Sequence, residues 1–264
     1  MKIISFILLV FLGFININAQ NGISVSPPRV YFESDNGVSK TQTITVANIS
    51  NTLPLDIAIS LGDWEYNENG DNIILAANTS PSSCASWINV KKEDSYFTLA
   101  PSEKRDIDIT ITSPNILNNN KAHSAILYVS QMNPYDDVDS NGANIKLSMK
   151  SGIKIFHKTT KPSVRKIDIN NLEFNPKKKT LILTMENQSD NWIDGKVITE
   201  IINNKTGKKT SFKPIVFYTM PGNIRILEIP LDENLSKGSY SASVLIDTDE
   251  KDNLEMGELN FDYE

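Results

Sequence analysis

ANIKLSMKSGIKIFHK, residues 143–158, carries an apolar side chain at almost every second position. The alternating apolar residues are Ile145, Leu147, Met149, Ile153 and Ile155. A period of two predicts a β-strand with one apolar face, and at about 3.3 Å per residue such a strand would extend roughly 50 Å. Ordinary strands contain about 3–10 residues. We therefore expect this strand to be shared between two structural units or to be offered to something outside its own domain.

The N-terminus has the pattern of a secretory signal peptide. A single Lys2 precedes an apolar run from residue 3 to residue 14, and Ile17 and Ala19 occupy the −3 and −1 positions of a cleavage site after Ala19. The run is too short to span a bilayer, and no later stretch reaches the roughly 20 apolar residues of a membrane helix. We expect residues 1–19 to be removed and the mature chain to be exported without an integral membrane segment.

Charge and cysteine content limit the function classes. The formal net charge is −6 and neither half of the chain is basic, so nucleic acid is not an expected partner. Cys84 is the single cysteine, which excludes an internal disulfide framework despite the oxidising destination. We interpret Cys84 as a thiol without a chemical role, and each domain must be stabilised by its apolar core.

The first half of the mature chain has the pattern of an all-β domain. Short segments rich in β-branched and aromatic residues alternate with Pro, Asn-Gly and Asp-Asn-Gly turn signals, which is typical of an immunoglobulin-like sandwich. The predicted strands before the long one are Ile23–Val25, Val30–Phe32, Thr41–Asn48, Leu55–Leu61, Trp87–Val90, Tyr96–Leu99, Asp106–Thr112 and Ala125–Gln131. We assign residues 20–158 to this domain.

A second set of strand patterns follows a short polar connection. Residues 159–162, TTKP, are the predicted hinge, and residues 163–264 the predicted second β-sandwich. Its predicted strands are Lys179–Met185, Gly195–Asn203, Phe212–Tyr218, Asn223–Ile229, Tyr240–Asp247 and Glu258–Tyr263. The fold class expected from the residues is therefore all-β, with two immunoglobulin-like domains.

The order of the motifs resembles the periplasmic pilus-assembly chaperones of the PapD-like family. The motifs are the signal peptide, SPPRV (26–30), TITVANIS (43–50), LAPSEKRDIDI (99–109), AILYVSQMNP (125–134) and IKLSMKSGIKIFHK (145–158). The resemblance implies two domains joined at an angle, a periplasmic location and a non-enzymatic protein without a cofactor. It also implies two partners: a pilus subunit or a similar incomplete immunoglobulin-like client, and an outer-membrane assembly platform.

The resemblance assigns roles to individual residues. Arg29 and Lys154 match the basic residues that bind the C-terminal carboxylate of a subunit in the cleft between the domains. Ile145, Leu147 and Met149 match the apolar residues that fill the groove of a subunit lacking its last strand. His123, Lys158 and Asp247 stand near the positions of interdomain contacts, with His123 replacing the acidic residue that is usual there.

Each assignment has a simpler alternative in the residues themselves. Arg29 could form a surface ion pair with Glu33, and Lys154 could be an outward lysine that protects an edge strand. The apolar residues of the long strand could be ordinary core residues. The alternative function is a secreted immunoglobulin-like structural or adhesion module of a surface or secretion assembly, which would use the same fold without a chaperone cycle.

Signatures of catalysis and metal binding are not found in the sequence. There is no Gly-x-Ser-x-Gly, P-loop, dinucleotide or His-Glu-x-x-His motif, and the two histidines, His123 and His157, are far apart in the chain. Residues 247–258 place acids at three positions of a calcium loop but have Lys251 and Asp252 where a ligand and a glycine belong. We expect no catalytic residue and no metal.

Overall fold

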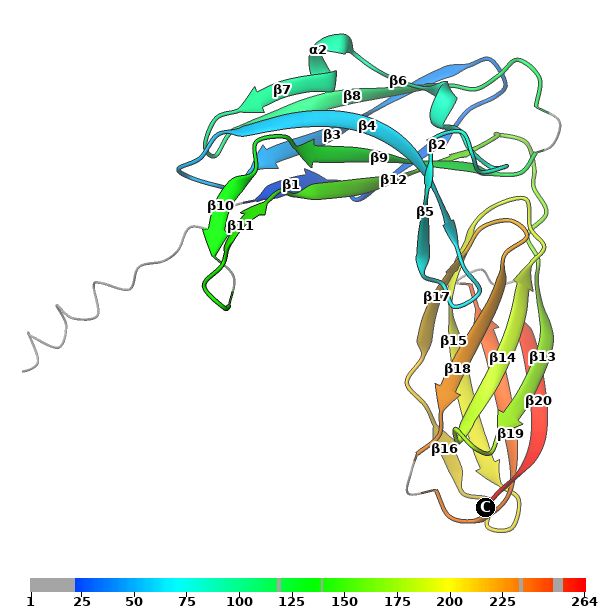
Figure 1. Cartoon of the computed structure of the whole chain (residues 1–264). Helices are drawn as coiled ribbons and strands as arrows, with labels where there is room; N and C mark the ends of the chain where they lie inside the picture. The colour runs from blue at the N-terminus through cyan, green and yellow to red at the C-terminus, as the bar shows by residue number, and fades with distance from the viewer. Residues whose placement is uncertain (1–21, 118–119, 139, 233–234, 249–253) are drawn as a thin grey trace, which may run out of the picture.

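The computed structural model describes residues 22–117, 120–138, 140–232, 235–248 and 254–264. The described chain forms two β-sandwich domains set at an angle to one another, as expected for the fold class (Figure 1). The predicted signal peptide lies outside the described residues. Among those residues, no helix is long and apolar enough to cross a membrane.

The N-terminal domain contains twelve strands in the described chain. They are β1 (Ile23–Ser26), β2 (Arg29–Glu33), β3 (Ser39–Asn48), β4 (Leu55–Tyr66), β5 (Asn72–Ala76), β6 (Ile88–Val90), β7 (Tyr96–Leu99), β8 (Lys104–Thr112), β9 (His123–Gln131), β10 (Tyr135–Val138), β11 (Asn144–Leu147) and β12 (Lys150–Lys158), with the short helices η2 (Ala85–Trp87) and α2 (Lys92–Ser95). One sheet has the order β1-β3-β8-β6; the other has the order β2-β12-β9-β4-β5, with β7 also paired to β4.

Alternation of side chains builds the core between these two sheets. Ile107, Ile109 and Ile111 point inward from β8 and are fully buried, while the polar residues between them lie on the outer face. Ile153 and Ile155 meet them from β12 and are also fully buried. The period-two pattern of the sequence is thus the pattern of burial in this part of the sandwich.

The prediction of one continuous strand from residue 143 to residue 158 is wrong. The strand is interrupted at Ser148 and Met149, and β11 pairs with β10 in a separate hairpin that projects from the sandwich (Figure 1). Gln131 fixes the backbone at the interruption. Its backbone N–H donates to the Met149 carbonyl at 2.8 Å, and its carbonyl accepts from Ser148 Oγ at 2.5 Å. Its side-chain oxygen also accepts from the Met149 N–H at 3.3 Å.

The C-terminal domain is a second sandwich with its own core. Its strands are β13 (Ile167–Asn175), β14 (Thr180–Asn187), β15 (Ile193–Asn203), β16 (Lys209–Ser211), β17 (Ile215–Thr219), β18 (Ile224–Pro230), β19 (Gly238–Asp247) and β20 (Glu255–Tyr263). One sheet has the order β13-β14-β18 and the other β16-β15-β19-β20, with β17 paired to β15. Leu181, Leu183, Phe217 and Val244 are fully buried between them. The strands β13 and β16 are additions to the predicted set.

A third apolar cluster joins the two domains. Trp64, Ile126 and Phe156 of the N-terminal domain pack with Met220 of the C-terminal domain, and the Trp192 ring lies 5.2 Å from the Phe156 ring. The connection between β12 and β13 runs from residue 159 to residue 166, and the predicted hinge forms its first half. The contact between the domains therefore includes an apolar cluster, to which Trp64, Ile126 and Met220 contribute from positions far from the connection in sequence.

Candidate functional site

Arg29 and Lys154 lie side by side. Strand β2 pairs in parallel with β12, and the register places Arg29 directly opposite Lys154. The Lys154 N–H also donates to the Pro28 carbonyl at 3.2 Å, which fixes the start of this pairing. Two residues separated by 125 positions in the sequence are thus brought together by one strand register.

Arg29 reaches across the cleft to the C-terminal domain. Its Nη1 lies 3.4 Å from Asp194 Oδ2, and its guanidinium carbon lies 4.4 Å from the centre of the Tyr218 ring. Asp194 and Tyr218 are themselves opposite one another on β15 and β17. The simpler alternative, an ion pair between Arg29 and Glu33, is not the pairing in the structure: Glu33 pairs with Lys158, with 3.3 Å between Oε2 and Nζ.

Lys154 is surrounded by aromatic rings and neutral hydrogen-bond acceptors. Its Nζ donates to Tyr66 Oη at 3.0 Å and to Asn72 Oδ1 at 2.6 Å, and it lies 3.7 Å from the centre of the Trp64 ring. Burial, together with the charge of Arg29, lowers the pKa of Lys154 to about 8, although Asp194 acts in the opposite direction. Burial likewise raises the pKa of Tyr66 to about 12, so this phenol stays neutral beside the lysine.

The charges at the site favour an anion. Arg29 and Lys154 together face one carboxylate, that of Asp194. Burial raises the pKa of Asp194 above its ordinary value, although the charges of Arg29, Lys154 and Arg165 act in the opposite direction. An arginine beside a lysine in a partly desolvated cleft offers a planar fork and a point charge, the combination that suits a carboxylate.

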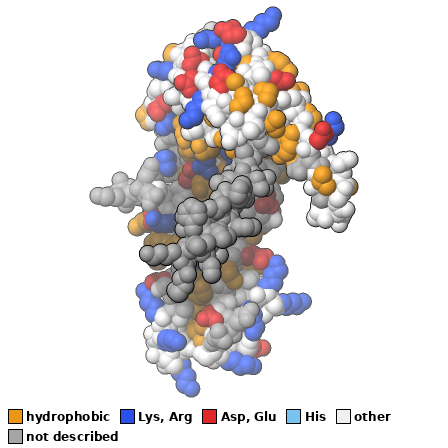
Figure 2. Space-filling view, turned by 90° about the vertical axis from the view of Figure 1, so that its left-hand side faces the viewer, with side chains coloured by type: hydrophobic (Ala, Val, Ile, Leu, Met, Phe, Trp, Pro, Cys, Tyr) orange, Lys and Arg blue, Asp and Glu red, His pale blue; other side chains and the backbone are white. Residues whose placement is uncertain are grey.

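The apolar residues before Lys154 form a half-buried row. Ile145, Leu147 and Met149 are each of intermediate exposure and alternate with exposed neighbours, whereas Ile153 and Ile155 are fully buried. The row therefore precedes the buried residues of β12 in sequence and lies at the interruption and on the projecting hairpin. Further hydrophobic side chains are exposed in this domain, such as Leu53, Met132 and Val138. The end of the N-terminal domain accordingly shows hydrophobic side chains at its surface (Figure 2).

One edge of β12 is open next to this row. The pairing with β2 covers only Lys154–Lys158, whereas the pairing with β9 covers Lys150–His157. Within the described chain, Lys150–Ile153 therefore have a strand partner on one side only. Unpaired backbone groups on an edge strand are a template for adding another strand.

The residues expected at the interface between domains have different surroundings. His123 begins β9, with its ring 4.5 Å from the Trp87 ring, and burial lowers its pKa. Lys158 pairs with Glu33 inside the N-terminal domain, and Asp247 pairs with Lys196 inside the C-terminal domain, with 3.3 Å between Nζ and Oδ2. Among the described residues, Arg29 and Asp194 form an ion pair that crosses between the domains.

Several interface residues carry no signal in the sequence. Arg225 Nη1 and the Ile226 N–H both donate to the Glu68 carbonyl at 2.8 Å, which ties the turn before β5 to β18. The Trp192 ring packs at a tilt against the rings of Tyr31 and Phe156. Each is a single residue in an otherwise ordinary strand or turn, so no periodicity or motif could have indicated it.

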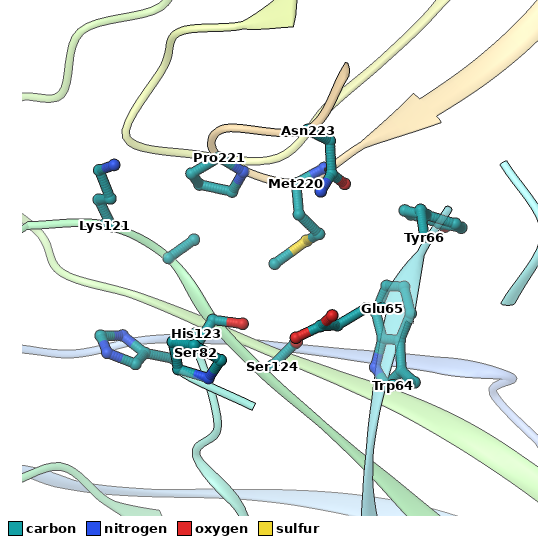
Figure 3. A pocket seen from close by; sticks show the side chains of 12 residues that line it. Trp64, Glu65, Tyr66, Ser82, Lys121, His123, Ser124, Met220, Pro221 and Asn223 are labelled. Atoms are coloured by element: carbon teal, nitrogen blue, oxygen red, sulfur yellow. The ribbon is translucent and has the colours of Figure 1, made fainter. Parts of the chain in front are cut away.

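A cavity of about 400 Å³ lies between the two domains beside the apolar cluster (Figure 3). Strand β4, the start of β9 and the turn before β18 line it. Among its lining residues are Trp64, Glu65, His123 and Met220. His123 therefore borders the interface without forming an ion pair across it in the structure.

Cys84 and the histidines are parts of the fold. Cys84 is fully buried in the core, and burial raises the pKa of its thiol. His157 is fully buried with Nε2 at 3.0 Å from Ser34 Oγ. Within the described part of the chain no three His, Cys, Asp or Glu side chains gather into a metal site. Residues 249–253, which belong to the calcium loop considered in the sequence analysis, lie outside the described residues.

No family model matches the sequence, and no curated protein matches it. Solved structures to which this chain is similar include three chaperones. The CupB2 chaperone of Pseudomonas aeruginosa is 11% identical over 91% of this chain and 100% of its own, with a TM-score of 0.45. The CsuC–CsuE chaperone–tip subunit pre-assembly complex of Acinetobacter baumannii is 11% identical over 90% and 97%, with a TM-score of 0.47. The SafB chaperone with the SafA pilin of Salmonella enterica is 13% identical over 92% and 97%, with a TM-score of 0.46. These similarities are at 11–13% identity and at TM-scores of 0.45–0.47.

Proposed function

We propose that this protein is a periplasmic chaperone that binds a pilus subunit, or a similar incomplete immunoglobulin-like client, by adding a strand to it. The observation that carries the proposal is the pair of neighbouring cations, Arg29 and Lys154, at the end of an unpaired strand edge. The client's C-terminal carboxylate binds to the two cations. Its last strand pairs with the open edge, which satisfies backbone groups that would otherwise cause aggregation.

The position of the cations sets the direction of the client strand. If the client's C-terminus lies at Lys154, the residues before it lie beside Ile153, and residues farther from the C-terminus lie beside Lys150. The client strand therefore runs in the same direction as β12. Strand β2 also runs parallel to β12 and begins opposite Lys154. The client strand therefore occupies the place that β2 leaves empty, end to end with it.

The half-buried row supplies the side chains that the client lacks. Ile145, Leu147 and Met149 are half-buried and alternate with exposed residues, as one face of an extended chain does. An incomplete sandwich has a groove where one strand is missing, and alternate apolar side chains fit such a groove. Because β11 belongs to a projecting hairpin, the row can enter the client without disturbing the chaperone's own core.

The proposed cycle requires no catalytic residue and no cofactor. Export by the signal peptide would place the protein in the periplasm, and an outer-membrane assembly platform would receive the client. A permanent structural module is the alternative, but such a module has no need for two cations beside an open strand edge.

The test is recovery of the tagged mature protein from its native periplasm. We expect the wild-type protein to carry one small β-rich chain whose C-terminus resists carboxypeptidase while bound. Arg29→Ala and Lys154→Ala should lose this chain and stay folded, whereas the matched control Lys104→Ala, an exposed lysine on β8 of the other sheet, should keep it. If the wild-type protein returns alone, or if the Arg29 and Lys154 variants retain the chain, the proposal is wrong.

A further inference from the structure

The side of Arg29 that faces the C-terminal domain is already occupied by a carboxylate. Asp194 Oδ2 lies 3.4 Å from Arg29 Nη1, and the Tyr218 ring covers the guanidinium at 4.4 Å. Both residues come from neighbouring strands of the other domain, where they are opposite one another. The side-chain carboxylate of an aspartate and the C-terminal carboxylate of a client are the same chemical group.

The position of Asp194 is fixed by its neighbours. Trp192, two residues earlier, packs against Phe156 and Tyr31 across the interface. Gly195, directly after it, leaves no room for a side chain, because a Cβ there would lie 2.7 Å from the Asp247 carbonyl oxygen. Strand β15 is therefore held at this point from both sides, and Asp194 is presented to Arg29 by packed structure.

The ion pair itself is weak. It uses one guanidinium nitrogen at 3.4 Å, and the two side chains are 30% and 41% exposed. Charged N–H···O bonds of good geometry are about 2.7–2.9 Å long, and arginine binds carboxylates best through two parallel bonds. A carboxylate that is free to orient itself can make that second bond, whereas Asp194 does not.

We propose that Asp194 is an internal competitor that occupies the carboxylate anchor in the unbound protein and is displaced when a client's C-terminus binds. This inference rests on the proposed function, because it concerns the same anchor. With Asp194 charged, the anchor of Arg29, Lys154 and Asp194 carries a net charge of +1. Without it the charge is +2, and any incoming anion is bound more tightly. Because Asp194 belongs to the C-terminal domain, its displacement also removes an ion pair between the two domains.

The experiment measures binding of a defined probe to the full mature protein. The probe is an acetylated peptide of alternating valine and threonine with a free C-terminal carboxylate, compared with the same peptide ending in an amide. We expect Asp194→Asn to bind the carboxylate peptide about fivefold more tightly than wild type, the factor that corresponds to the upper range for a partly exposed ion pair. Binding of the amide peptide should not change. Asp194→Glu should behave as wild type, since it keeps a competing carboxylate.

Two controls separate the possible outcomes. Glu228→Gln removes one negative charge from an ion pair with Lys178 inside the C-terminal domain, and it should leave both affinities unchanged. If Asp194→Asn binds the carboxylate peptide as wild type does, or more weakly, then Asp194 is not a competitor and the inference is overturned. If wild type does not distinguish carboxylate from amide and Arg29→Ala changes nothing, the anchor itself fails, and the proposed function fails with it.

Discussion

Replacing Lys154 with methionine tests whether the proposed anchor is maintained at the expense of stability. The lysine lies half-buried among Trp64, Tyr66 and Arg29, and this environment lowers its pKa from 10.5 to about 8. Each pKa unit corresponds to about 1.4 kcal/mol, which sets a ceiling of about 3 kcal/mol on the cost of the charge. Because the side chain is partly exposed, solvent screening reduces this cost to about 1 kcal/mol. We expect Lys154→Met to be more stable than wild type by that amount at pH 7.

The sign of the pH dependence follows from the lowered pKa. Between about pH 8 and pH 10.5 the unfolded chain holds the Lys154 proton while the folded protein has lost it, so the wild-type protein gains stability as the pH rises through this window. The advantage of the methionine variant should therefore be present at pH 7 and smaller at pH 10. Tyr66 stays neutral in this range, since its pKa is about 12.

Urea unfolding followed by tryptophan fluorescence measures both quantities. Lys150→Met is the matched control, because Lys150 is an exposed lysine on the same strand whose Nζ also lies over an aromatic ring, at 3.6 Å from the centre of Tyr128. The control should show no comparable gain. A methionine variant that is less stable than wild type at pH 7, or a difference that stays constant up to pH 10, would refute the argument from burial.

Other expected outcomes concern the hairpin, a buried histidine and the domain contact. Leu147→Asp should abolish client binding and leave thermal stability unchanged, because Leu147 is half-buried on a projecting hairpin. The control Leu53→Asp, at an exposed leucine outside the hairpin, should leave client binding unchanged. Burial lowers the pKa of His157 to about 4, so wild-type stability should fall from pH 6.5 toward pH 4 by about 2 kcal/mol, and His157→Gln should show a smaller fall in the same denaturation series. Trp192→Ala should widen the distribution of domain angles in solution scattering, because its ring packs on Phe156; an unchanged scattering profile would contradict this.

Local patterns predicted most of the strands, whereas the candidate anchor residues came from the resemblance to a known family. Tyr96–Leu99 was predicted with the same bounds as β7, and most other strands were predicted to within a few residues. The interruption at Ser148 and Met149 could not be predicted, because it depends on hydrogen bonds from Gln131, a residue on another strand. Strand β5 was missed because its apolar residues Ile73 and Ile74 are exposed and have no alternating pattern.

The sequence by itself determined that the chain is all-β, that it carries an export signal pattern, and that an arginine and a lysine stand in the order typical of pilus chaperones. Those features are local, since period-two alternation, turn residues and short motifs depend on neighbouring positions only. Only the tertiary structure decided that Arg29 lies opposite Lys154, that Asp194 and Tyr218 come from the other domain to meet them, and that part of one edge of β12 stays open. These contacts depend on strand register and on the packing of Trp192 and Met220 between the domains, which bring together residues more than a hundred positions apart.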